Sequence, residues 1–205
     1  MAAEVDRIAA PPCAPDAHTR RRGQTLERAI YDAVLYQLHT VGYIGLTMEG
    51  IATCAHTGKA ALYRRWPAKD HLVIDALEHA LPPLTELPDH GNVRDDLLDV
   101  LRRIAAIVNS PVGSALKCLL AETDKDHPFV HLVHERILRP RKEMFQRVAE
   151  RAAERGEVRC EAVSPLVLEV GPAMVAQRFL ADGPPVPDDF IVSVVDDLVV
   201  PLLRK

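Results

Sequence analysis

The chain has 205 residues, of which 48% are hydrophobic and only 4% aromatic, and its formal net charge is −4. This hydrophobic content excludes a disordered chain, and the length is enough for one large domain or two small ones. No apolar run reaches the roughly 18 residues that cross a bilayer, and the N-terminus lacks the pattern of a signal peptide, so we expect a cytoplasmic protein with no membrane partner.

The N-terminal part begins with two segments of different character. Residues 1–18 are rich in Pro and Ala and lack helical periodicity, so we expect a flexible arm there. The three arginines Arg20–Arg22 follow. They are candidates for contact with phosphates or a minor groove, and a solubilising arm is an equally good alternative. A helix is then predicted over residues 24–41, where apolar residues repeat every four positions, and Gly42 ends it.

Two more short helices are predicted next. Thr47 is a natural N-cap for the second helix, and His56–Gly58 is the turn that follows it. The third helix is predicted over Lys59–Trp66, and Pro67 ends it because a proline disfavours helical backbone at the preceding residue. A short helix held across another by a turn is the arrangement that places side chains in the major groove of DNA.

The remainder of the chain is also predicted to be helical. Pro140 should kink one of these helices, since its ring removes a backbone hydrogen bond. No segment shows convincing strand alternation, so the sequence predicts an all-α fold of about nine helices. The expected ranges are 68–81, 93–108 with Asn92 as its cap, 111–122, 128–155, 165–180 with Ser164 as its cap, and 187–203.

The segment from Leu46 to Leu77 resembles the DNA-binding motif of the TetR/AcrR family of bacterial transcriptional regulators. The resemblance rests on an ordered set of residues at the family's spacing, namely Gly42-Tyr43, Leu46-Thr47, Ile51-Ala52, Ala55, Leu62-Tyr63-Arg64, Trp66 and Lys69. Two later segments, Glu135–Val158 and Gly171–Phe190, resemble the C-terminal domain of a subgroup common in actinobacteria. The resemblance implies an N-terminal helix-turn-helix DNA-binding domain at residues 19–67 and a helical ligand-binding and dimerisation domain at residues 68–205.

The family resemblance further implies a homodimeric repressor that a small-molecule effector releases from double-stranded operator DNA. Lys59 can donate to guanine or a phosphate, small alanines let the third helix approach the groove floor, and Tyr63 offers a hydroxyl to a phosphate. The alternative for Arg64 and Arg65 is a solvated helix end. The candidates for DNA contact are Arg20, Arg21, Arg22, Thr47, Lys59, Ala60, Ala61, Tyr63, Arg64, Arg65 and Lys69.

This chain departs from the family pattern at the turn and at the start of the third helix. Many relatives have Gly-Val-Ser where it has His56-Thr57-Gly58, and Gly-Thr where it has Ala60-Ala61. The bases that the helix contacts therefore do not follow from the motif. Charge supports DNA binding locally: Arg20 to Ala80 holds eight Lys or Arg against six Asp or Glu, a net +2 within an acidic protein.

The C-terminal two-thirds supplies candidates for an effector pocket and a dimer interface. The pocket candidates lie on the middle helices, and plain core packing is the alternative for each of them. They are Leu101, Ile104, Val108, Leu119, Phe129, Val133, Ile137, Met144, Phe145, Met174, Gln177 and Arg178. The dimer candidates lie on the last two helices, which the family packs against a partner: Leu166, Val170, Ile191, Val194, Val195, Leu198 and Leu202.

Other functions find less support in the sequence. His127, His131 and His134 share one helix face at a spacing that can gather a metal, but we take a polar helix face as the better interpretation and expect no metal site. No cofactor is predicted, and no nucleophile–base pair or phosphate loop indicates an enzyme. The main alternative to a repressor is an all-helical small-molecule-binding protein whose DNA binding is weak or lost.

Overall fold

The computed structural model describes residues 23–83, 86–122, 124 and 126–204. The secondary structure of these residues is entirely helical, which confirms the predicted all-α fold. Of the described helices, none is long and apolar enough to cross a membrane. The elements are α1 Gln24–Gly45, α2 Met48–Cys54, α3 Lys59–Tyr63, α4 Lys69–Ala80, α5 Val93–Val108, α6 Pro111–Glu122, α7 Pro128–Val133, α8 Arg139–Glu154, α9 Pro165–Asp182, α10 Asp188–Ser193 and α11 Val200–Arg204, with a 3-10 turn at Cys160–Ala162.

The predicted helix starts are in place. Thr47, Asn92 and Ser164 each accept a hydrogen bond from the backbone N–H three residues later, at 3.0, 2.9 and 3.4 Å. These bonds satisfy amide groups that the first turn of a helix leaves without a partner. Gly42 breaks α1 as predicted: its φ of 70° and ψ of 178° are non-helical, and a short turn continues to Gly45.

Two helices contain wide π-helical turns, and each turn lies just before a proline. The turn His134–Leu138 joins α7 to α8 ahead of Pro140, and the turn Val194–Val199 joins α10 to α11 ahead of Pro201. A proline lacks an N–H and its ring displaces the carbonyl four residues earlier, so a wider turn fits the chain locally. A kink was predicted at Pro140, and the structure has a widened turn just before it. The helix predicted over 187–203 is found as a continuous helical stretch from Asp188 to Arg204, with the widened turn inside it.

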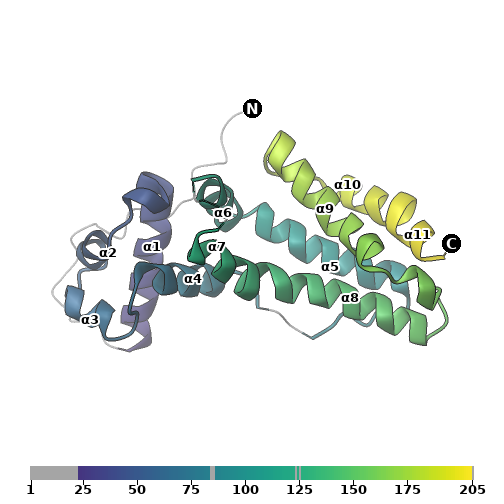
Figure 1. Ribbon diagram of the computed structural model, residues 1–205, viewed down its shortest axis with the longest axis horizontal. Helices are drawn as coiled ribbons and strands as arrows, with labels where there is room; N and C mark the ends of the chain where they lie inside the picture. Colours follow the sequence, from purple (N-terminus) through teal and green to yellow (C-terminus); the bar gives the residue numbers. More distant parts are fainter. Residues whose placement is uncertain (1–22, 84–85, 123, 125, 205) are drawn as a thin grey trace.

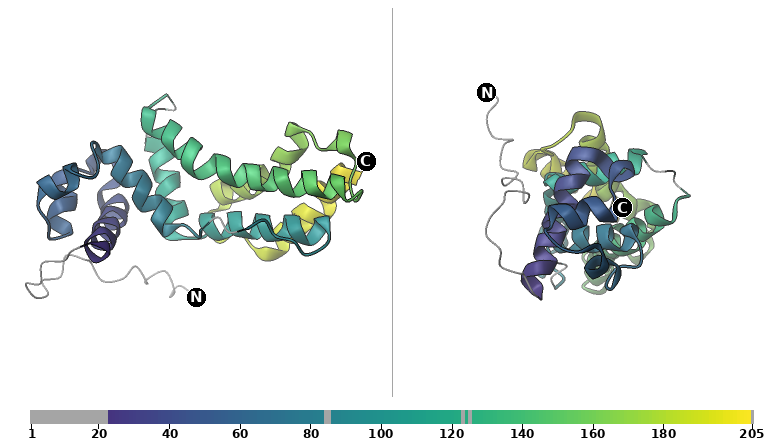
Figure 2. Two further views of the ribbon diagram at one scale, coloured as in Figure 1. Left: turned by 90° about the horizontal axis from the view of Figure 1, so that it is seen from below. Right: turned by 90° about the vertical axis from the view of Figure 1, so that its left-hand side faces the viewer.

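The buried side chains form two separate cores along an elongated molecule. The first core joins α1–α4 with Ile107 near the end of α5 and with α6 and α7, and the second joins the rest of α5 with α8–α11. Helices α1–α3 lie at one end of the molecule and α8–α11 at the other (Figure 1), and the view from below shows the same division along the long axis (Figure 2). Gly171 lets α9 approach closely, since a Cβ there would lie 3.1 Å from Phe145 and 3.2 Å from Leu101.

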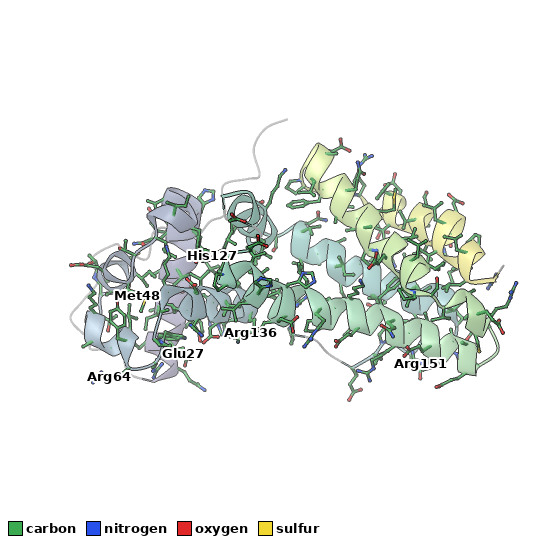
Figure 3. All side chains as sticks on the ribbon, viewed as in Figure 1. Glu27, Met48, Arg64, His127, Arg136 and Arg151 are labelled. Carbon is green, nitrogen blue, oxygen red and sulfur yellow. The ribbon has the colours of Figure 1, made fainter. Side chains whose placement is uncertain are left out.

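Asp96, on α5, is the one charged side chain among the described residues that is fully buried. It accepts hydrogen bonds from Arg151 of α8 and from Arg155, the residue just after α8, both at 3.0 Å, and from the backbone N–H of His90 at 2.7 Å. Figure 3 shows Arg151 on α8, far from the α1–α3 end of the molecule. A buried carboxylate is stable only when it is paired in this way, so the cluster ties the segment before α5 to α8.

Candidate DNA-binding surface

The turn between α2 and α3 is held by two backbone hydrogen bonds. The His56 N–H donates to the Thr53 carbonyl at 3.1 Å, and the Thr57 N–H donates to the Ala52 carbonyl at 2.9 Å. This pair of bonds is the Schellman motif, which requires a left-handed residue after the helix. His56 fills that position with a φ of 53°, where glycine is preferred. The turn predicted at His56–Gly58 is therefore found, with a strained residue at its start.

Helix α3 is anchored on one side and open on the other. Leu62 and Trp66 are buried, as their four-residue spacing predicts. The Trp66 indole N–H donates to Asp75 on α4 at 2.7 Å, and its ring packs edge-on against Tyr31 of α1 at 5.9 Å between centroids. These contacts fix the angle at which the outer face of α3 is presented.

Helix α3 is shorter than predicted, since it ends at Tyr63 and not at Trp66. The backbone beyond it tightens: the Arg65 N–H donates to the carbonyl of Leu62, three residues earlier, at 2.9 Å. Pro67 contributes to this end, because it has no N–H to donate to the Tyr63 carbonyl and disfavours helical backbone at Trp66. Gly58 serves as the N-cap residue, with no side-chain hydrogen bond to the first turn.

The outer face of α3 carries most of the predicted DNA contacts. Lys59, Ala60, Tyr63 and Arg64 are exposed and Ala61 is half-buried. The Lys59 ammonium lies 3.4 Å from Glu49, an exposed pair that costs little to break. Tyr63 is 49% exposed, large for an aromatic side chain. Figure 3 shows Arg64 at the outer end of the molecule, directed away from the cores.

Three further predicted contacts are in different surroundings. The Arg65 guanidinium lies 3.6 Å from Glu27 of α1, with both side chains about two-fifths exposed. Thr47 is exposed, and its oxygen accepts the capping bond of α2. Lys69 is half-buried and points inward: its ammonium donates to the backbone carbonyls of Tyr43 and Leu46. Arg20, Arg21 and Arg22 lie outside the described residues.

The predicted pocket residues do not come together in one place. Four belong to the first core and six belong to or pack against the second core, while Gln177 is exposed and Arg178 pairs with Asp182 at 2.8 Å. The first group is Leu119, Phe129, Val133 and Ile137; the second is Leu101, Ile104, Val108, Met144, Phe145 and Met174.

Ile104 and Met144 do line a small cavity, about 30 Å³, between α5, α8 and the segment Pro82-Pro83. That volume holds about one water molecule. Arg141 also lines it, and burial lowers the pKa of its guanidinium from the ordinary value. Its Nη1 donates to the Ile137 carbonyl at 2.6 Å.

The predicted dimer residues divide into buried and exposed sets. Ile191, Val194 and Val195 are buried in the chain's own second core, and Val170 is half-buried. Leu166 is 75% exposed, Leu198 38% and Leu202 36%. Large apolar side chains at such exposure on α9, the second π-helical turn and α11 are available to another molecule.

No group of three or more His, Cys, Asp or Glu among the described residues is arranged to hold a metal ion. His127 instead caps α7, where its Nδ1 accepts from the Phe129 N–H at 3.1 Å. The sequence prediction missed three contacts that link the N-terminal helices to the rest: Trp66 to Asp75, Asp75 to Arg136, and Tyr43 to Phe129. The Gly42-Tyr43 pair indicates that the tyrosine ring is held in one position, but no neighbouring residue in the sequence identifies Phe129 as its partner.

Comparison with known proteins agrees with this arrangement. The family model described as "Bacterial regulatory proteins, tetR family" matches residues 30–76, and "Tetracyclin repressor-like, C-terminal domain" matches residues 87–198. An uncharacterised HTH-type transcriptional regulator of Mycobacterium tuberculosis is 28% identical over 208 residues, which cover 100% of this chain and 98% of the relative. A DNA-binding transcriptional repressor TetR of Mycobacteroides abscessus is 29% identical over 184 residues, covering 89% and 96%.

Among solved structures, the TetR family transcription regulator SCO0332 superposes with a TM-score of 0.65 at 28% identity, covering 85% of this chain and 96% of that one.

Proposed function

Because the chain belongs to the TetR family of bacterial regulatory proteins, we propose that it is a homodimeric repressor released from operator DNA by a small-molecule effector. One observation carries the DNA-binding part of this proposal. Helix α3 is held from behind by Leu62 and Trp66, while Lys59, Tyr63 and Arg64 are exposed on its outer face. Its site of action is the cytoplasm, where a bacterial chromosome lies.

We assign the contacts by chemistry. Lys59 donates to a base edge or a phosphate, and Tyr63 and Arg64 donate to phosphates. The methyl groups of Ala60 and Ala61 leave room for the helix to enter the groove and can touch a thymine methyl. Thr47 offers its hydroxyl to a phosphate, Arg65 reaches the backbone after leaving Glu27, and Arg20, Arg21 and Arg22 extend the basic surface.

The test begins with a duplex that the wild-type protein selects from a random DNA pool. Lys59→Ala and Tyr63→Ala should weaken binding to that duplex, each by about 1–3 kcal/mol if the lost contact is a good one. Helix content and the mass of the assembly in sedimentation should stay unchanged, since both side chains are exposed. Wild-type affinity in both variants would contradict the assignment of α3 as the reading helix.

The dimer proposal is supported by the exposed leucines Leu166, Leu198 and Leu202. Two half-sites bound together give the affinity that a single short helix lacks. Leu198→Arg combined with Leu202→Arg should produce monomers in analytical ultracentrifugation, because a charge would be buried in the interface. Leu138→Arg is the matched control, since Leu138 is 41% exposed but lies on a different helix. A control variant that also dissociates, or a double variant that does not, would refute this interface.

The effector part of the proposal is tested by a ligand-shift melting screen in the presence and absence of the selected duplex. An effector should raise the melting temperature of the free protein and lower the protein's affinity for DNA, since the effector favours the state that does not bind DNA. A protein that small molecules stabilise but that selects no duplex at low salt would instead be a small-molecule-binding protein that has lost its DNA role.

A further inference from the structure

The Lys69 side chain is committed to contacts inside the protein. Its ammonium donates to the Tyr43 carbonyl at 3.0 Å and to the Leu46 carbonyl at 3.3 Å. It also lies over the Tyr43 ring, 4.3 Å from the centroid, which is a cation–π contact. An ammonium has three N–H donors, and two of them are used by these carbonyls. A phosphate contact would compete with these contacts for the half-buried ammonium.

Tyr43 links this lysine to a second helix. Its hydroxyl donates to Asp70 of α4 at 2.6 Å, and its ring is stacked on Phe129 of α7, with 4.6 Å between centroids and 21° between planes. The His127 ring meets it edge-on at 6.1 Å, and His127 lies at the start of α7 (Figure 3). Burial, and then the bond to Asp70, raise the pKa of the Tyr43 hydroxyl.

The group formed by Tyr43, Lys69, Asp70 and Phe129, which we call the Lys69 clasp, acts at the start of α2. Leu46 directly precedes Thr47, whose side chain caps α2. The clasp therefore holds the carbonyl one residue before the cap against α4, and the Tyr43 ring against α7. Gly42 permits this because its left-handed φ of 70° turns the chain so that Tyr43 is buried.

We propose that Lys69 is a positioning residue for DNA binding and makes no phosphate contact, and that the clasp makes α7 a direct determinant of the orientation of α2 and α3. A displacement of Phe129 moves Tyr43, and with it the carbonyls to which Lys69 is bonded. The helix-turn-helix then changes its angle without any movement of the middle of α4. This inference rests on the proposed DNA-binding function, and it adds a route into the helix-turn-helix that starts at α7.

The first test compares Lys69→Met with Lys59→Met on the duplex that the wild-type protein selects. Binding is measured by fluorescence anisotropy over a range of salt concentrations. A lost phosphate contact reduces the slope of log affinity against log salt by about 0.9 per protomer, or about 1.8 per dimer. We expect Lys59→Met to reduce the slope if Lys59 contacts a phosphate. Lys69→Met should leave the slope unchanged and weaken binding about tenfold, the equivalent of one good base contact. A slope reduced by about 1.8 in Lys69→Met, or an unchanged affinity, overturns the proposal.

The second test separates positioning from general loss of stability. Hydrogen exchange of Lys69→Met should increase in peptides that cover residues 46–54, while peptides from α8 and α9 keep wild-type exchange. Uniform acceleration across all of these peptides would show a merely structural role. Wild-type exchange over residues 46–54 would show that the clasp does not hold α2.

The α7 route is tested by Phe129→Leu, with Val148→Ala as the control. Both residues are fully buried, but Val148 belongs to the second core. Both variants should melt at lower temperature, and only Phe129→Leu should weaken operator binding, at an unchanged salt slope. Equal affinity of the two variants refutes the route through α7. If the wild-type protein selects no duplex, the proposed function fails instead, and the exchange experiment still decides whether the clasp holds α2.

Discussion

Replacing Asp75 with alanine tests how α3 is attached to the rest of the molecule. Asp75 accepts from the Trp66 indole at 2.7 Å with one oxygen and faces the Arg136 guanidinium at 2.9 Å with the other. Arg136 also holds Glu78 through two nitrogens. Figure 3 shows Arg136 near the junction of the two halves of the molecule. The alanine removes the acceptor of a buried donor and one side of an ion pair at the same time.

The two losses differ in size. Trp66 is only 3% exposed, so its indole N–H would be left without an acceptor, at a cost of about 1–3 kcal/mol. The side chains of Asp75 and Arg136 are 29% and 39% exposed, so solvent screening reduces the ion pair to about 0.2–1 kcal/mol. We therefore expect Asp75→Ala to lower the free energy of unfolding by about 2–3 kcal/mol, most of it from the indole. For a chain of this length the melting temperature falls by about 5–10 °C.

Urea unfolding followed by circular dichroism measures the effect at low salt and at about 1 M NaCl, where the Debye length is only about 3 Å. The Asp75→Ala cost should persist in salt, whereas the cost of Arg136→Met should be about 1 kcal/mol and should shrink. In a Trp66→Phe background, which removes the donor, Asp75→Ala should cost about 1 kcal/mol or less. Equal costs for Asp75→Ala and Arg136→Met that both vanish in salt would refute the reasoning.

Three further predictions concern stability. Asp96→Ala removes the acceptor of two arginines and should lower the free energy of unfolding in urea by about 3 kcal/mol. This is the low end for a broken buried pair, because both arginines retain other acceptors. A decrease below about 1 kcal/mol would contradict this prediction. His56→Gly relieves a left-handed φ of 53° and should raise stability by about 1 kcal/mol, and an unchanged melting temperature would count against strain at this turn. The hydrogen bond from Arg103 lowers the pKa of Asp99, so the stability from this pair is present above the unfolded pKa of about 4 and is lost as pH falls below it. Between about pH 5 and 2.5, the melting temperature of Asp99→Asn should therefore fall less with decreasing pH than that of the wild-type protein. The same dependence on pH in both proteins would exclude this contribution.

Features set by a few neighbouring residues could be predicted from the sequence. A cap such as Thr47 acts within three residues, so its position fixes the start of α2. The outward face of α3 follows from the same kind of local rule, since Leu62 and Trp66 mark the buried side. The widened turn before Pro140 could be expected only in part. A proline shows that a backbone bond is missing, but packing decides between a kink and a widened turn.

Contacts between distant residues could not be predicted in this way. The resemblance to the family motif made Lys69 a candidate for a contact with the DNA backbone. Its actual position depends on the carbonyls of Tyr43 and Leu46, which lie 26 and 23 residues earlier. The same limit applies to the pocket candidates. Helical periodicity identifies Phe129 and Phe145 as buried, but it does not show that they belong to different cores.

The arrangement of the two cores bears on how a signal can reach the DNA-binding helices. The stretch from α7 to α8 is helical throughout, with Phe129 and Ile137 in the first core and Met144 in the second. Its π-helical turn lies near the point where the helix passes from one core to the other, and wide turns of this kind are often found at functional sites. The first core also needs α6 and α7 to cover α1, so a division of the chain at residue 67 would expose the apolar face of α1. The helix-turn-helix is thus built into the same core as α7, and α8 is connected to Tyr43 through one continuous helix and one ring contact.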